Sequence, residues 1–409
     1  MGGSVPDIPG VEVEETFAKS LRWEVSQLVG RDNQHFPGAQ PVSFARSHIN
    51  MLQTEDFFVC EKSDGIRCLL YCTVDEGGSE AHYLIDRKNA YYYLQGLHFP
   101  LPDDIQSFHV ATLIDGELVN DTMPDGSVQL KYLVFDCLTL DGDRLMQRTL
   151  DKRIAYFTDK VFTPYEKLYK EFPEEIQYLP FLVEFKKMER SYGIEMMFKD
   201  ILPKLLHGND GLIFTCRTSP YKFGTDEHIL KWKPESENTI DFRLNLDFPL
   251  LEPESDDEGD EEALDYDAMP IMNLSVTVRS KGREKVYEKY STMYMTPEEW
   301  EHMKSLNKPL EDTIVECAQD DQGRWRFFRF RDDKTDANHI STVESIIESI
   351  HDRVSERDLV MAAKKIKDGW RKRQNAQDSR DASELERAKK RAEAHQRREA
   401  EELNHSREH

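Results

Sequence analysis

The stretch FFVCEKSDGIRCLLYC, residues 57–72, decides how the whole chain is interpreted. Its Phe, Val, Cys and Leu residues predict buried strands, yet Lys62 stands at its centre and is followed closely by Gly65 and Arg67. An ammonium group is strongly hydrated, so a lysine between apolar neighbours is either a solvated residue of a surface hairpin or a nucleophile. The hairpin is the better interpretation of this motif alone, so the choice depends on the other segments of the chain.

Length and composition predict a folded protein of two domains. A chain of 409 residues exceeds the size at which a single hydrophobic core keeps growing. Much of the net charge of -24 comes from residues 251–268, which are acidic at more than half of their positions and which we expect to form a disordered insert. The six cysteines show neither metal-ligand spacing nor a disulfide pattern, and no apolar run is long enough to cross a bilayer. We therefore expect a reducing compartment and no membrane association.

The order of the expected strands and helices predicts an α+β fold. From residue 57 to residue 135 the chain reads mostly as strands separated by Gly, Pro and Asp, which indicates a core rich in antiparallel sheet. Residues 239–340 contain five short strand-like runs and one helical insert, a pattern typical of a small β-barrel of the OB type. Residues 341–375 have the amphipathic pattern of a C-terminal helix, and residues 376–409 form a charged tail that is either a solvated helix or disordered.

Three segments place a carboxylate or an aromatic ring inside an apolar strand. In TLIDGELV, Glu117 needs a partner such as a sugar hydroxyl, a lysine or a metal, although a tight hairpin turn is the alternative. In YLVFDCL, Phe135 could stack on a purine or belong to the core, and in DGLIF, Asp210 enters an apolar strand directly after a helix. Each of these segments is weak evidence when it is taken alone.

Two further segments concentrate cations. In LKWKP, the period of a strand puts Lys231 and Lys233 on one face and Trp232 on the other, and two converging ammonium groups are suited to hold a phosphate. In RWRFFRFRDDK, Arg329 and Arg331 share a strand face, and arginine binds phosphate oxygens bidentately. A solvated strand face explains either segment equally well in isolation.

The order of these segments carries more information than any one of them. The succession KSDGIR, DGE, VFD, DGLIF, LKWKP and RFRDDK resembles the collinear motifs of the covalent nucleotidyltransferases, the superfamily of mRNA capping guanylyltransferases and polynucleotide ligases. It covers residues 40–338, and LKWKP, DGLIF and the ending of RFRDDK are most similar to the capping enzymes. The resemblance implies a nucleotidyltransferase domain over residues 1–238, an OB-fold domain over 239–340 with the insert 251–268, the C-terminal helix 341–375 and the tail 376–409.

The same resemblance implies a reaction and a role for each motif residue. Lys62 would attack the α-phosphorus of GTP, release pyrophosphate and hold GMP as a phosphoramidate, which a 5′-diphosphate RNA would attack to give the GpppN cap. Asp210 would be linked to the metal, Phe135 would stack on guanine, and Lys186, with Lys187 as the alternative, would contact guanine O6. The remaining implied contacts are Arg67 and Glu117 with the ribose, Arg87 with the sugar or a phosphate, Lys231 and Lys233 with the α-phosphate, and Arg329, Asp332, Asp333 and Lys334 with the β- and γ-phosphates.

The resemblance also implies a cofactor and partners. The cofactor is Mg²⁺ or Mn²⁺, because a divalent cation screens the triphosphate from its nucleophile. No H-C-x5-R phosphatase loop precedes Lys62, so we expect the free-standing fungal type with a separate RNA 5′-triphosphatase as partner. A nuclear enzyme that binds the phosphorylated tail of RNA polymerase II is implied by the family. The alternatives are an ATP-dependent RNA or DNA ligase that forms lysyl-AMP, and an inactive scaffold that binds nucleotide or the polymerase tail without turnover.

Overall fold

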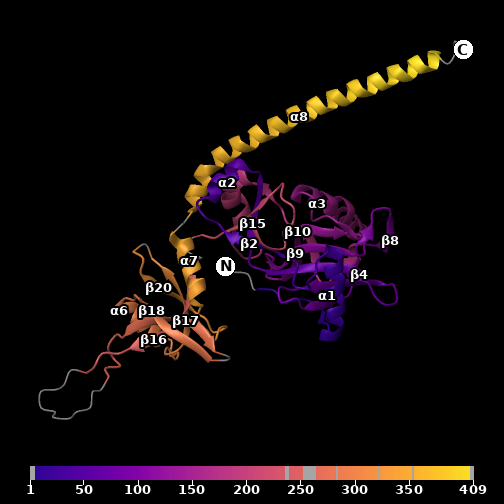
Figure 1. The fold of residues 1–409 in the computed structure, drawn as a ribbon. Coiled ribbons are helices and arrows are strands. Elements are labelled where there is room, and N and C mark those ends of the chain that lie inside the picture. Colours follow the sequence, from indigo (N-terminus) through magenta and orange to yellow (C-terminus); the bar gives the residue numbers. More distant parts are fainter. Residues whose placement is uncertain are drawn as a thin grey trace, which may run out of the picture. The chain divides into compact units, whose positions relative to one another are not determined.

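The computed structural model describes residues 5–234, 239–251, 264–281, 284–320, 322–351 and 354–405. The chain forms two compact units, which are coloured along the sequence in Figure 1. The first unit contains Met1–Val42, Ser47–Trp232 and Glu356–His409, and the second contains Ser43–Arg46 and Lys233–Ser355. The expected acidic insert, residues 251–268, lies mostly outside the described residues.

The first unit is built around an eight-stranded sheet that is mostly antiparallel, as the sequence predicts. Its strands follow the order β1-β6-β5-β4-β9-β10-β11, and β12 pairs in parallel with β10. The bounds are β1 Val11–Glu12, β4 Ile66–Val74, β5 Glu80–Ile85, β6 Tyr91–Leu94, β9 Thr112–Thr122, β10 Val128–Leu140, β11 Asp143–Arg144 and β12 Leu182–Phe185. A separate small pair is formed by β7 Pro100–Leu101 and β8 Asp104–Phe108.

A second sheet in the same unit holds the segment that contains Lys62. Its order is β13-β3-β14-β15-β2, with bounds β2 Ala39–Ser43, β3 Phe57–Ser63, β13 Glu189–Arg190, β14 Asn209–Cys216 and β15 Gly224–Trp232. Because β3 belongs to this sheet and β4 to the larger one, the chain crosses between the sheets at the KSDGIR motif. The interpretation of this motif as a surface hairpin is therefore wrong.

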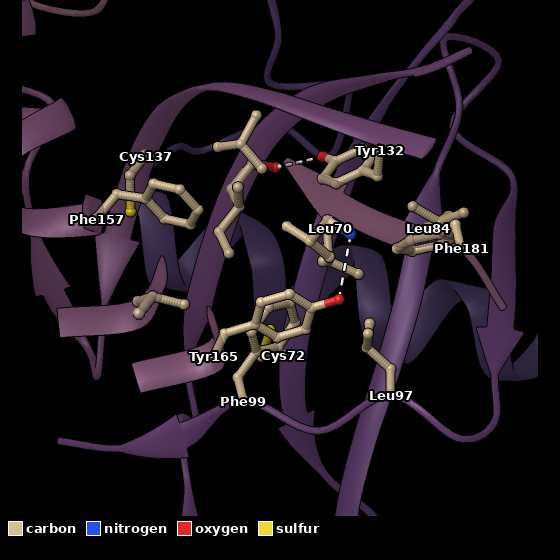
Figure 2. Packing of buried hydrophobic residues seen from close by; sticks show 14 of the residues in the cluster. Leu70, Cys72, Leu84, Leu97, Phe99, Tyr132, Cys137, Phe157, Tyr165 and Phe181 are labelled. Carbon is tan, nitrogen blue, oxygen red and sulfur yellow. Dashed lines mark hydrogen bonds between the residues drawn. The ribbon is translucent and has the colours of Figure 1, made fainter. Parts of the chain in front are cut away.

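The larger sheet is buried on both of its faces. Along β4, Leu70 belongs to one apolar cluster and Leu69 to another, and both side chains are fully buried. A strand that is covered on both faces needs no alternation of polar residues, which explains the continuous run CLLYC, residues 68–72. Figure 2 shows the first cluster, where the hydroxyls of Tyr132 and Tyr165 form hydrogen bonds with backbone atoms at 2.9 and 3.2 Å.

Short helices cover the sheets of the first unit. They are α1 Glu15–Val29, α2 His48–Thr54, α3 Leu150–Phe157, α4 Thr163–Glu171 and α5 Ile194–Met196, with π-helical turns at Thr158–Phe162 and Met197–Ile201 and 3-10 turns at Pro173–Tyr178, Ser191–Gly193 and Leu202–Lys204. Leu21 and Val25 of α1 pack in one cluster, and Phe157 of α3 and Tyr165 of α4 pack in the other. The helices thus supply the cover that a sheet buried on both faces requires.

The second unit is a closed five-stranded barrel of order β16-β17-β18-β20-β19. Its strands are β16 Thr239–Asp247, β17 Ile271–Lys281, β18 Glu284–Met293, β19 Ile314–Gln319 and β20 Trp325–Phe330. The pairings are antiparallel except that between β18 and β20, and five strands in this order agree with the expected barrel of the OB type. Trp300 of α6 Pro297–Ser305 and Val343 of α7 Ile340–His351 are buried in the barrel core.

The C-terminal region differs from the single helix expected over residues 341–375. It forms α7, which belongs to the second unit, and α8 Glu356–His405, which belongs to the first. The separation has a physical cause, because Trp370 and Arg373 of α8 bind the first unit, where Arg373 Nε donates to Asp56 at 2.7 Å. None of the described helices is both long and apolar enough to cross a membrane.

Candidate active site

A cavity of about 140 Å³ in the first unit is lined by residues from both sheets. Six residues predicted from the sequence line it, namely Lys62, Arg67, Arg87, Glu117, Phe135 and Lys186. They come from β3, β4, β9, β10 and the segments that follow β5 and β12. The structure therefore brings together residues that are separated by as many as 124 positions in the sequence, 186 minus 62.

Lys62 lies near the end of β3 and forms an ion pair with Asp210 of β14. The Nζ of Lys62 is 2.5 Å from Oδ1 of Asp210, and the two side chains keep 24% and 18% of their exposure. The pairing of β3 with β14 is irregular between Asn209 and Leu212, and Gly211 in this irregularity has a φ of 144°, which favours glycine. The irregularity is what turns the Asp210 carboxylate toward the amine.

Gly65 allows the crossing between the sheets to approach β9 closely. A Cβ atom at Gly65 would lie 2.2 Å from the carbonyl oxygen of Leu118, so any other residue would force the backbones apart. Asp115, Gly116 and Glu117 lie in the middle of β9, which rules out a hairpin turn at this motif. Gly65, and Gly116 whose added Cβ would lie 2.8 Å from the carbonyl oxygen of Leu133, therefore serve the close packing of strands beside the cavity.

Lys186 is buried among carboxylates and faces the cavity. Its Nζ lies 3.2 Å from Oε2 of Glu117 and 3.7 Å from Oε1 of Glu61, and it donates a hydrogen bond to Ser63 Oγ. Burial opposes the charged form, but the two carboxylates outweigh it and raise the pKa of Lys186 above its usual range. The neighbouring Lys187 is exposed, so of the two candidates only Lys186 lies in the cavity.

Further charged side chains, on the side of Lys186 away from the cavity, balance its partners. Glu61 is buried, and although burial alone would raise the pKa of its carboxyl, Lys186 and His207 lower it below the ordinary value. His207 Nδ1 lies 2.7 Å from Asp121 Oδ1, and its Nε2 lies 3.7 Å from Glu61. Lys131 pairs in turn with Asp121 at 2.8 Å, so cations and anions alternate from the cavity toward the surface.

Arg67 is held rigidly on the floor of the cavity. Its Nε and Nη2 donate to the two carboxylate oxygens of Asp115 at 2.9 and 2.6 Å, while Nη1 donates to the carbonyl oxygen of Ala39. Tyr221 donates its hydroxyl proton to Asp115 at 2.7 Å. Burial opposes the charge of Arg67, yet Asp115 raises the pKa of the guanidinium above its usual range. Arg67 is therefore a fixed cation.

The ring of Phe135 is half-buried and faces two cations. The Cζ of Arg67 lies 5.5 Å from the ring centroid and the Nζ of Lys186 lies 6.0 Å from it. Phe135 occupies a bulge, because Val134 pairs with Gly116 and Asp136 pairs with Asp115, which leaves Phe135 unmatched. A bulge re-aims a side chain, and this one gives the cavity an aromatic wall.

Lys231 shares a face of β15 with Ile229, which lines the cavity. Trp232 lies on the opposite face, where it is buried against Phe198 with ring centroids 5.4 Å apart. The predicted alternation along LKWKP is therefore confirmed for these two residues. Lys233 follows the end of β15 and belongs to the second unit.

The remaining predicted residues lie in the second unit and are paired within the barrel. Arg329 Nε lies 2.5 Å from Glu316, and the side chain of Arg329 is 61% exposed. The other pairs are Asp332 with Lys308 at 2.9 Å, Asp333 with Arg331 at 2.7 Å, and Lys334 with Asp241. Through its hydrogen bonds from Arg331, the pKa of the Asp333 carboxyl is held below its usual range.

Sequence reasoning missed several residues that shape the cavity. They are Ser63, Asp115, Asp136, Arg153 and Tyr221. Ser63 and Asp115 stand inside quoted motifs, and Arg153 could have been noticed as a cation three residues after Leu150 on the apolar face of its helix. Arg153 is fully buried and donates to both oxygens of Asp136 at 2.7 Å. Nothing in the local sequence of Tyr221 indicates its role.

The carboxylates near Lys62 fit the divalent metal that the motifs imply. In the described ranges no three or more His, Cys, Asp or Glu side chains are grouped to hold a metal by themselves. Mg²⁺ in phosphoryl-transfer sites is typically bound through one or two carboxylates together with substrate phosphates. Asp210, whose Oδ1 is 2.5 Å from Nζ of Lys62, is a donor of this kind.

A lysine where the chain crosses between two sheets, with a five-stranded barrel as the second unit, agrees with a nucleotidyltransferase, and the family models show that class. The family model described as "mRNA capping enzyme, catalytic domain" matches residues 4–235, and "mRNA capping enzyme, C-terminal domain" matches residues 237–360. The chain therefore belongs to the mRNA capping enzyme family and is an enzyme.

Named relatives agree with the family models. The mRNA-capping enzyme subunit alpha of Neurospora crassa is 52% identical over 90% of this chain and 95% of the relative. The subunits alpha of Schizosaccharomyces pombe and Saccharomyces cerevisiae are 46% and 37% identical, over 89% and 90% of this chain and 88% and 87% of theirs. Among solved structures, a mycobacterial DNA ligase D complexed with ATP and MES covers 73% of this chain and 94% of its own at 15% identity, with a TM-score of 0.34.

Proposed function

We propose that this protein is an mRNA guanylyltransferase in which Lys62 carries the GMP. The observation that supports this most directly is the ion pair of 2.5 Å between Asp210 and Lys62, which lines a cavity together with Arg67, Phe135 and Lys186. Once the ammonium of Lys62 has lost a proton to solvent, its Nζ attacks the α-phosphorus of GTP. A P–N bond forms as the nitrogen loses a second proton, and the bond to the bridging oxygen breaks so that pyrophosphate leaves. An oxygen of the terminal phosphate of a 5′-diphosphate RNA then attacks the same phosphorus, the P–N bond breaks, and the amine is regenerated with release of GpppN-capped RNA.

The cavity residues receive roles that follow from their surroundings. Phe135 offers its half-buried ring to guanine, and Lys186 is close enough to that ring to reach a base atom such as O6. Arg67 and Glu117 pair across β4 and β9 on the cavity face, where we assign them to the ribose, with exposed Arg87 at the rim as a further sugar or phosphate contact. The fixed geometry of Arg67 reduces the reorganisation that binding requires.

The phosphates of GTP are assigned to cations that lie outside the base pocket. Lys231, on the cavity face of β15, and Lys233 contact the α-phosphate in this proposal. The barrel residues Arg329, Asp332, Asp333 and Lys334 orient the β- and γ-phosphates as the leaving group. Mg²⁺ or Mn²⁺, held in part by Asp210, neutralises charge on the triphosphate.

The partners are proposed from the family. The relatives are named subunit alpha, which supports assembly with a separate subunit. We assign an RNA 5′-triphosphatase to that subunit, because the acceptor must carry a diphosphate end. The nucleus, and binding to the phosphorylated tail of RNA polymerase II, follow from the same role.

The experiment is incubation with Mg²⁺ and either GTP or ATP labelled at the α-phosphate, followed by a denaturing gel and acid treatment. We expect a GTP-specific, acid-labile label that is chased into RNA when a 5′-diphosphate RNA is added. Label from ATP alone would assign the protein to the ligases, and no label from either nucleotide would support the scaffold.

A further inference from the structure

The segment KKIKDGWRKR of α8, residues 364–373, is basic in a chain whose net charge is -24. Lys364, Lys365, Lys367, Arg371 and Lys372 are exposed and are here called the α8 basic surface. Within the part of the chain that the structure describes, no ion pair is recorded for these five side chains. A cluster of exposed cations on an acidic protein attracts polyanions locally despite the overall charge.

The α8 basic surface is held rigidly on the first unit by the opposite face of the helix. Leu359, Ala362, Ile366 and Trp370 recur at helical spacing and are buried. Gly369 permits the close contact of α8 with α2, because a Cβ atom there would lie 2.2 Å from the carbonyl oxygen of Gln53. The cations therefore have a defined position on the same unit as the cavity.

Two strands of the second sheet connect the cavity to this surface. Met188 lines the cavity and Arg190 follows two residues later, while Thr215 lines it and Arg217 follows two residues later. Two residues of extended chain span about 7 Å. The Cζ atoms of Arg190 and Arg217 lie 5.6 and 5.5 Å from the ring of Trp370 on α8.

The cations continue along the helix and are interleaved with aromatic rings. Lys367 Nζ lies 5.6 Å from the ring of Tyr192, which is half-buried and meets Trp370 edge to face. Arg371 stands one helical turn after Lys367 and is exposed. Arg217 is balanced by Asp56 and Asp151 at 2.9 and 2.8 Å, so exposed Arg190 and the α8 cations supply the net positive charge. Basic residues with interspersed aromatic rings are typical of surfaces that bind single-stranded nucleic acid.

We infer that the α8 basic surface binds the phosphate backbone of the acceptor RNA behind its reacting end. This inference rests on the proposed function, since it needs an RNA whose 5′-diphosphate end enters the cavity. An RNA with its end at Lys62 carries further phosphates outward. Arg190, two residues after the cavity residue Met188, is the first of the exposed cations, which continue on α8 of the same unit at Lys367 and Arg371, with one acidic residue, Asp368, among them. A phosphorylated peptide has no such requirement to begin at the cavity.

The test is a comparison of two double variants of the full chain. Lys367→Glu with Arg371→Glu reverses the charge at two positions of the α8 basic surface. Arg380→Glu with Arg387→Glu makes the same change of charge at exposed positions further along α8. Binding of a long 5′-diphosphate RNA is measured by fluorescence anisotropy over a range of salt concentrations. We expect the first variant to lose about tenfold in affinity and its salt slope to fall by about 1.4, which corresponds to two lost phosphate contacts. The control should bind as the wild type does.

Further readouts separate this inference from its alternatives. Lysyl-GMP formation and transfer to a dinucleotide acceptor should be unchanged in both variants, while transfer to the long RNA should show a raised KM at constant kcat. Lys367→Gln with Arg371→Gln replaces the first variant if the charge reversal prevents folding. Unchanged RNA affinity of the Lys367 and Arg371 variant would overturn the inference. So would a variant that still binds RNA but no longer binds a phosphorylated polymerase-tail peptide. If the wild type forms no lysyl-GMP the proposed function fails, yet anisotropy still reports on RNA binding.

Discussion

The cavity of the first unit and the RFRDDK segment of the second unit hold their charges in different ways. In the cavity, Lys186 is buried and is balanced by Glu117 and Glu61, which come from other strands. In the barrel, the pairs that Arg329 and Asp333 form each have an exposed member, because these two side chains are 61% and 65% exposed, although Arg329 is held by buried Glu316 of another strand. Charge clusters whose members are all largely buried form a rigid site, whereas pairs with an exposed member exchange more easily for an incoming phosphate. The comparison teaches that the fold builds the nucleotide pocket in advance and leaves the barrel motif adaptable.

The largest expected effect is the loss of the covalent intermediate in Lys62→Arg. Arginine keeps the positive charge and can still pair with Asp210, but it has no amine that can be deprotonated to attack phosphorus. We expect labelling by GTP to fall at least about 10⁴-fold while the fold stays close to that of the wild type. Lys187→Arg, at an exposed position outside the cavity, is the matched control and should label normally. A labelled Lys62→Arg protein would show that another residue is the nucleophile.

The next largest effect is a loss of unfolding free energy in Lys186→Met. The substitution leaves Glu117 and Glu61 without their shared cation in a buried site, which should cost about 3 to 5 kcal/mol of unfolding free energy. Urea unfolding followed by circular dichroism measures the loss, and Lys187→Met provides the comparison at an exposed position. A difference below about 1 kcal/mol, the range of surface pairs, would contradict the contrast between the cavity and the barrel.

For the cavity of the first unit, the sequence predicts which residues take part better than it predicts where their side chains point. The order of the six motifs predicts the class, and the apolar run of β4 predicts burial on both faces, because both depend on residue types alone. The aim of Phe135 and Asp210 could not be predicted, since each depends on a bulge whose position is set by the partner strand. The role of Arg153 could not be predicted either, because its helix has an ordinary amphipathic pattern and its partner Asp136 lies on a distant strand.

The C-terminal region shows the limit of periodicity more clearly. The apolar stripe of α8 predicts a helix with a buried face but does not say which unit covers that face. Trp370 decides this through its hydrogen bond to Ser191 at 3.2 Å and through Phe58 and Tyr192, which are distant in sequence. The pair of Arg331 with Asp333 is the opposite case, because the two residues stand two positions apart, whereas the contact of Arg331 with Asp241 again depends on a distant strand.

A smaller effect on stability is expected from His207→Gln, and it should depend on pH. His207 faces the carboxylates of Asp121 and Glu61, which also bind Lys131 and Lys186. Burial would lower the pKa of His207, but the two carboxylates raise it above its ordinary value of 6.5. A raised pKa means that the stabilising charge is fully present below about 6.5 and is lost as the pH rises through the folded-state pKa.

The measurement is the difference in unfolding free energy between wild type and His207→Gln as a function of pH. We expect a difference of about 1 to 2 kcal/mol at pH values below the ordinary pKa, as for a hydrogen bond to a charged group, and a decrease at higher pH. Replacement of exposed His302 in α6 by Gln is the control, and it should give no pH-dependent difference. A constant difference across the pH range would show that the imidazole acts through packing and not through its charge.

The smallest effect on stability is expected from Arg329→Gln in the barrel. Its ion pair with Glu316 lies at a side chain that is 61% exposed, so its loss should change the unfolding free energy by less than about 1 kcal/mol. The same variant should reduce lysyl-GMP formation at least about tenfold if Arg329 orients the leaving pyrophosphate, because the lost cation acts on charge that develops in the transition state. Arg326→Gln, on the same strand and paired with Glu299, removes an equal charge outside the motif and should leave labelling unchanged. Equal labelling by the two variants would place the phosphate contacts elsewhere and leave the barrel motif with a purely structural role. A selective loss in Arg329→Gln would show that an exposed charge contributes little to folding and much to catalysis.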